Sequence, residues 1–209
     1  MIGFFRRFFQ YAMTISILFP VAAIAHHPLG GEMPTTFLDG FLSGIGHTLI
    51  EPAHLLFLLG FAVLMGVSQI SPSKAAAFII SFLSAVSLGT LLAFNLSLIF
   101  FPPIFLAVCL LVLGSLLWLR AIPRIMGLLF ILATGFCHGV AFSETVLGAE
   151  STPILDYISG LVVIQSALLF FLFLLIRYLA ISHGDVMKLF SRFLVAALTT
   201  SGAIMALAF

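Results

Sequence analysis

Residues 46–60 have the sequence GHTLIEPAHLLFLLG, a leucine-rich stretch that also carries His47, Glu51 and His54. Apolar residues continue on both sides of it, and they lack the period-two alternation of a half-buried strand. A long apolar run without that alternation favours a helix buried on all sides. The stretch is therefore interpreted as part of a membrane helix that carries polar side chains.

The composition of the whole chain supports a membrane protein. Of its 209 residues, 63% are hydrophobic and only 7% are charged, and the mean hydropathy is +1.32. Soluble domains usually carry about 25% charged residues. Inside a bilayer the backbone must satisfy its own hydrogen bonds, which leaves helices or a closed barrel, and the long apolar runs indicate helices. The predicted fold class is an all-α, polytopic membrane helix bundle.

Residues 1–25 have the layout of a secretory signal peptide. Arg6 and Arg7 form a basic start, an apolar core follows, and Ala23 and Ala25 provide a small-residue end. Cleavage after Ala25 is predicted, and it would leave a short tail outside the membrane. The alternative is an uncleaved first membrane helix, because about 20 apolar residues can span a bilayer.

Proline, glycine and polar clusters divide residues 38–209 into six apolar segments, after a histidine-bearing tail at 26–37. The first segment is unusually long, and Pro52 lacks the backbone N–H that a continuous helix requires. We expect this segment to kink or break near Glu51. The six predicted spans are 38–67, 75–100, 103–119, 123–142, 154–179 and 186–208.

The distribution of charge predicts the orientation of these spans. With the mature N-terminus outside, every lysine and arginine falls on the inner side, in agreement with the positive-inside rule. Most acidic residues fall near the outer face. These patterns predict a multi-pass protein of a bacterial-type inner membrane, with the mature N- and C-termini on the periplasmic side. Without Arg6 and Arg7 the mature chain has slightly more acids than bases, which gives no reason to expect a nucleic-acid partner.

Histidines and carboxylates gather in the predicted outer half. The spacing of His47, Glu51 and His54 places them on one stripe of a helix, provided that the kink at Pro52 does not rotate its two halves apart. Ionisable groups inside a membrane are costly and usually mark a transport path or cofactor site. Imidazole with carboxylate suits Ni²⁺, Co²⁺, Zn²⁺ or Cu²⁺. Alternatively, the membrane histidines are hydrogen-bonding partners between helices, and the tail histidines are merely solvated. The candidate metal ligands are His47, Glu51, His54, His138 and Glu144, with His26 and His27 as capture ligands.

Two blocks of the sequence resemble the HupE/UreJ membrane proteins. They are TFLDGFLSGIGHTLIEPAHLLFLLGFAVLMG at 36–66 and FCHGVAFSETVLGAESTPILDYISGLVVIQ at 136–165. The resemblance extends over essentially the whole mature chain. It implies secondary transport of Ni²⁺ or Co²⁺, a role associated in that family with the supply of hydrogenase or urease. By position, His47, His54, His138 and Glu144 match the family's metal-site candidates.

The chain departs from the family's pattern at several of these positions. Ala53 stands where the family has the aspartate of an Asp-His pair, and Phe142 stands where many members have a histidine. Thr48 replaces a usual proline, and Glu51 a usual glycine. Glu51 lies three residues before His54 and is the candidate replacement for the absent aspartate, although its place along the helix differs.

Two functions from different classes follow from these observations. The first is a permease for a divalent transition metal, with the bilayer and the ion as its partners. The second is an accessory or assembly subunit that keeps this fold without transporting and packs against a membrane-protein partner. An enzyme is not expected, because the sequence has no Gly-x-Ser-Gly element and no His-Glu-x-x-His helix. No prosthetic group is expected.

Overall fold

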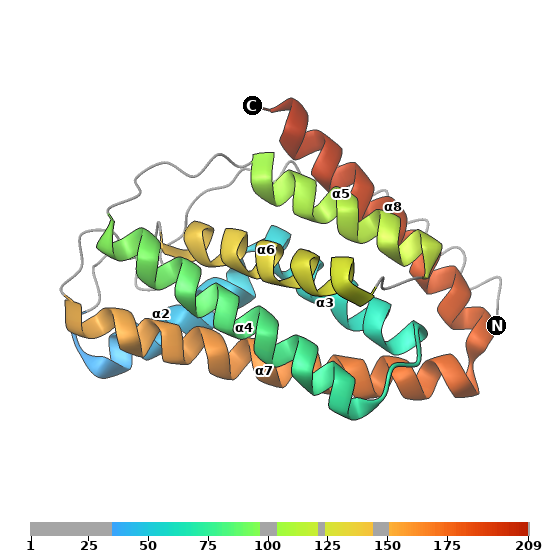
Figure 1. Ribbon diagram of the computed structural model, residues 1–209, viewed down its shortest axis with the longest axis horizontal. Coiled ribbons are helices and arrows are strands. Elements are labelled where there is room, and N and C mark those ends of the chain that lie inside the picture. The colour runs from blue at the N-terminus through green and yellow to red at the C-terminus, as the bar shows by residue number, and fades with distance from the viewer. Residues whose placement is uncertain (1–34, 97–103, 121–123, 144–150, 209) are drawn as a thin grey trace.

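The computed structural model describes residues 35–96, 104–120, 124–143 and 151–208. Within these ranges the regular elements are all helices, which agrees with the predicted all-α class. Most of them run lengthwise in the view of Figure 1, and the last helix is tilted across the others. The helices are α2 (Phe37–Ile50), α3 (Pro52–Val67), α4 (Pro72–Asn95), α5 (Ile104–Leu119), α6 (Arg124–Ser143), α7 (Ser151–Ser182) and α8 (Gly184–Leu207).

Local sequence explains where several helices begin. At the start of α2, Asp39 N donates to Thr36 Oγ1 at 3.2 Å, and Thr36 N donates to Asp39 Oδ2 at 3.1 Å. This reciprocal pair is a capping box, which satisfies two backbone donors that the helix leaves unpaired. The helices α3 and α4 each begin with a proline, a residue whose fixed φ suits the first helical position.

The predicted segments agree with the helices to within a few residues at their described ends. Residues 97–100, at the end of the second segment, lie outside the described residues. The predicted break in the first segment is confirmed, because α2 and α3 meet at Glu51 with a bend of 75°. The signal peptide and most of the tail also lie outside the described residues, so they remain predictions.

The lengths of the helices support a membrane protein without establishing all six spans. In the described part of the chain, α4, α7 and α8 are each long and apolar enough to cross a bilayer, and α2 with α3 makes a fourth if the bent pair is one span. By contrast, α5 has 16 residues, which at about 1.5 Å per residue covers less than a hydrocarbon core of about 30 Å. Many large apolar side chains on the outer surface are exposed, as a lipid environment requires, including Ile80, Trp118, Phe171 and Leu207.

The helices pack in pairs around the first span. The long helix α7 contacts both α2 and α3, while α4 packs against α6 and α5 against α8 (Figure 1). Glycines permit the closest approaches. A Cβ at Gly44 of α2 would collide with the Tyr157 carbonyl of α7, and one at Gly160 of α7 would collide with the Phe41 carbonyl of α2. Small residues of this kind allow membrane helices to bring their backbones together.

Segments that carry opposite charges lie at opposite ends of the bundle. The α3–α4 turn, the end of α5 and the α7–α8 turn share one end, and the starts of α2 and α7 share the other (Figure 1). Lys74, Arg120 and Lys188 lie in or next to the first group of segments, together with the acidic Asp185, whereas Asp39 and Asp156 lie in the second group. This separation agrees with the charge asymmetry used to predict orientation, and the side of the membrane remains a prediction.

Candidate metal site at the break in the first span

The break between α2 and α3 forms a corner at Glu51, and one histidine lies on each side of it. Glu51 has an extended backbone, with φ −83° and ψ 107°, and it forms both the C-cap of α2 and the N-cap of α3. His47 lies in the last turn of α2 and His54 in the first turn of α3, and their ring centroids are 5.9 Å apart. The bend of 75° at this break turns the two halves apart, so His47 and His54 do not share a stripe of one helix. The two imidazoles nevertheless remain neighbours.

His138 of α6 completes a group of three histidines. Its Nδ1 lies 2.5 Å from Nδ1 of His54, and both side chains are buried, with exposed fractions of 2% and 3%. At this separation at least one of the two nitrogens must be an acceptor, because two N–H groups pointing at each other would repel. The Nε2 atom of His138 is buried and has no hydrogen-bond partner in the described part of the chain. Such an atom is costly to bury and calls for an explanation.

Aromatic rings enclose this group. Phe142 stacks on His54 with centroids 4.0 Å apart and meets His47 edge-on at 5.0 Å. The ring centroids of Phe57 and His138 lie 4.3 Å apart. The hydroxyl of Tyr157 donates to the Phe142 carbonyl at 2.9 Å and so links α7 to the end of α6. The surroundings of the histidines are therefore apolar, and electrostatic interactions within the group are stronger than they would be in water.

A buried amide lies close to the same corner. Gln165 of α7 is fully buried, and its Nε2 donates to Thr48 Oγ1 at 3.3 Å. Thr48 follows His47 and donates in turn to the Gly44 carbonyl at 3.3 Å. The Oε1 atom of Gln165 has no partner among the described residues. Sequence reasoning missed Gln165, although a lone amide in an otherwise apolar stretch of α7 is the kind of polar membrane residue that signals a site.

The structure brings together some of the predicted ligands. His47, His54 and His138 form one group. Glu51 is half-buried at the break, and within the described ranges its carboxylate makes no hydrogen bond or ion pair with a histidine. Glu144, His26 and His27 lie outside the described residues. In the described part of the chain, no three histidine, cysteine, aspartate or glutamate side chains are arranged to hold one metal ion.

The distance between the Nδ1 atoms of His54 and His138 shows how far this pair must open to bind a metal ion. An ion with metal–nitrogen bonds of about 2.0–2.1 Å in tetrahedral geometry holds two nitrogens about 3.3 Å apart. The nitrogens of His54 and His138 are 2.5 Å apart, so a movement of somewhat less than 1 Å would open the pair. The proton between them would have to leave, because a nitrogen that binds a metal must be free of its proton.

These features define a helical membrane protein with a buried histidine cluster at a broken helix. The family profile described as HupE / UreJ protein matches residues 13–205. The chain therefore belongs to the HupE/UreJ family, as its sequence motifs indicated. Neither the curated proteins nor the solved structures contain a significant match.

Proposed function

We propose that this protein is a membrane permease for a divalent transition metal ion, with Ni²⁺ or Co²⁺ as its cargo. Membership of the HupE/UreJ family supports a role associated with nickel and cobalt transport. The observation that carries the proposal is the meeting of His54 and His138 from separate helices beside a helix break. Broken helices in transporters commonly provide the binding site for the transported ion.

In this proposal the three buried histidines supply the nitrogen ligands. His54 and His138 bind through Nδ1 after the pair opens, and His47 approaches from the other side of the corner. Glu51 and Glu144 supply carboxylates, while His26 and His27 capture the ion before it enters. Zn²⁺ and Cu²⁺ fit the same ligand chemistry, so family membership alone favours nickel and cobalt. The site would open toward the periplasmic side of an inner membrane and then toward the cytoplasm.

A second function has a specific observation in its favour. Phe142 contacts both His47 and His54, so an apolar ring occupies space beside the two imidazoles that a metal ion would need. A protein that kept the fold and lost transport would act as an accessory or assembly subunit and bind a larger membrane complex. In that case the histidines would serve only to hold α2, α3 and α6 together.

Uptake of radioactive nickel or cobalt by cells that express the protein separates the two functions. We expect His54→Ala and His138→Ala to reduce uptake to background while the amount of membrane-inserted protein stays unchanged. His183→Ala is the matched control, because His183 is exposed at the α7–α8 turn. Glu51→Gln tests the carboxylate separately and should also abolish uptake. Normal uptake in the His54 and His138 variants would refute the permease proposal, and stable copurification with a partner would then support an accessory subunit.

A further inference from the structure

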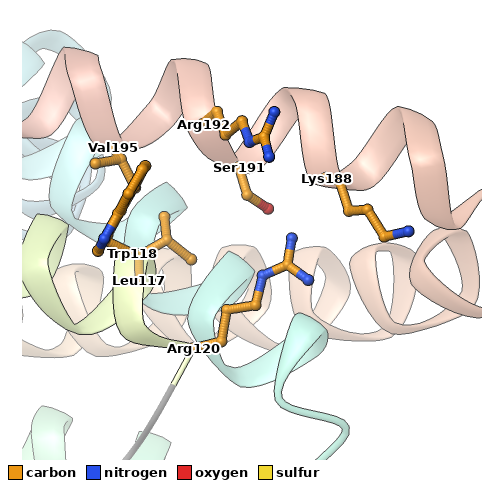
Figure 2. A pocket seen from close by; sticks show the side chains of 7 residues that line it. All are labelled: Leu117, Trp118, Arg120, Lys188, Ser191, Arg192 and Val195. Atoms are coloured by element: carbon orange, nitrogen blue, oxygen red, sulfur yellow. The ribbon is translucent and has the colours of Figure 1, made fainter.

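A cluster of cations surrounds a hollow at the basic end of the bundle. The hollow has a volume of about 240 Å³ and lies between the end of α5 and the first turns of α8. Figure 2 shows the Arg120 side chain extending from the end of α5 toward α8, where Ser191 and Arg192 lie across the hollow. The lining residues are Leu117, Trp118, Arg120, Lys188, Ser191, Arg192 and Val195.

Regular spacing on α8 produces one wall of this hollow. Lys188, Ser191, Arg192 and Val195 follow the i, i+3, i+4 and i+7 pattern, so they share one face of the helix. Arg120 faces them from α5, where its backbone adopts a positive φ of 51° directly after the last helical turn. Non-glycine residues rarely adopt this conformation. The opposed walls thus bring three cationic side chains to one opening.

The charge of the cluster is largely uncompensated. No carboxylate lines the hollow, and in the described ranges Arg120 and Arg192 form no ion pair. Lys188 bonds to Asp185 at 2.9 Å, and both of these side chains are mostly exposed. An exposed pair of this kind is weak, so Lys188 is still available to an anion. A cluster of two free arginines and a lysine is suited to bind a phosphate group.

The apolar side of the hollow suggests where the phosphate comes from. Trp118 is 66% exposed and Leu119 68%, and Trp118, Leu117 and Val195 lie on the opposite side of the opening from Lys188 (Figure 2). Trp118 is the single tryptophan of the chain, and tryptophan concentrates at the headgroup level of membranes. A ligand that touches both walls therefore has an anionic head and an apolar body.

A second hollow adjoins the first. It has a similar volume of about 240 Å³ and shares Arg120 and Lys188, while its other lining residues come from the end of α3 and the turn after it, the end of α7 and the start of α8. Arg120 and Lys188 thus stand between two hollows at the basic end of the bundle. Basic pockets between membrane helices are a known form of headgroup site.

We propose that the hollow between α5 and α8 binds the headgroup phosphate of an anionic phospholipid. Arg120 and Arg192 hold the phosphate oxygens, Lys188 adds a third positive charge, and the acyl chains lie along Trp118 and the apolar surfaces of α5 and α8. This site is independent of the histidine cluster and of the proposed transport. Its predicted place is the inner leaflet, because the basic end of the bundle is the predicted cytoplasmic end.

Native mass spectrometry of the full chain in detergent tests this site. Phosphatidylglycerol is the anionic probe and phosphatidylethanolamine the zwitterionic one. We expect the Arg120→Gln/Arg192→Gln variant to bind phosphatidylglycerol about 30-fold more weakly, or about fivefold for each arginine removed. Lys74→Gln is the matched control, because Lys74 is exposed at the same end of the bundle and lines neither hollow. An Arg120→Lys/Arg192→Lys variant keeps the charges and should retain most of the binding, which separates charge loss from misfolding.

Three results would overturn the proposal. The first is equal binding of the two lipids by the unmodified protein. The second is an unchanged preference for phosphatidylglycerol in the Arg120→Gln/Arg192→Gln variant. The third is displacement of the lipid by inorganic phosphate at similar concentration, which would identify a site for a soluble anion instead.

Discussion

α7 and the α2–α3 pair lie side by side, but they differ in the continuity of their helices. α7 is one uninterrupted helix from Ser151 to Ser182, whereas its neighbour breaks at Glu51 and bends by 75°. The continuous helix contacts both halves of the broken one. It provides a rigid support along which the corner and its histidines are held. In this protein the histidines therefore gather where helical hydrogen bonding is interrupted, and an intact neighbouring helix holds that interruption in place.

The largest expected effect on stability comes from a substitution that pushes α7 away from α2. Gly160→Ala places a Cβ against the Phe41 carbonyl of α2, and backbone cannot yield as a flexible side chain can. We expect a loss of about 3 kcal/mol in the free energy of unfolding, measured by denaturation in detergent. Gly184→Ala is the matched control, because a Cβ there meets nothing within 4 Å. Equal stability of the two variants would contradict the close contact between α2 and α7.

A smaller effect is expected from repairing the break itself. Pro52→Ala restores a backbone N–H and removes the ring that hinders a continuous helix. We expect the bend to decrease and His54 to move away from His47. Because a small displacement of a ligand weakens a site strongly, the cobalt affinity of the purified protein should fall about tenfold. Pro72→Ala, at the first position of α4, should leave the affinity unchanged. If both variants bind cobalt as the unmodified protein does, the bend does not organise the site.

The smallest effect concerns the hydrogen bond that joins α7 to α2 just before the break. Gln165→Leu removes the bond to Thr48, but it also removes a buried carbonyl that has no partner in the described part of the chain. These changes offset each other in part, so we expect the unfolding free energy to fall by about 0.5–1 kcal/mol. Ser166→Ala, which alters a bond within α7 alone, serves as the control. A loss several times larger would show that the amide is a principal contact between the helices.

Much of the fold follows from local sequence. Apolar runs and turn signals predict the helices, and the missing N–H of Pro52 predicts the break. The arrangement of the site is harder to predict, because it depends on which helices become neighbours. Nothing in the spacing of His54 and His138 along the chain places their rings in contact. The stacking of Phe142 on His54 and the bond from Gln165 to Thr48 likewise arise from tertiary packing, which a local pattern does not encode.

In the proposed function, the histidines at the break form a metal site. Calorimetric titration of the purified protein with Co²⁺ tests it directly. We predict one Co²⁺ ion per chain, bound through the unprotonated imidazole nitrogens of the cluster. His54→Ala/His138→Ala should lose this binding, and His183→Ala should keep it. Absence of binding in the unmodified protein, or unchanged binding in the His54→Ala/His138→Ala variant, would show that these histidines do not form a metal site.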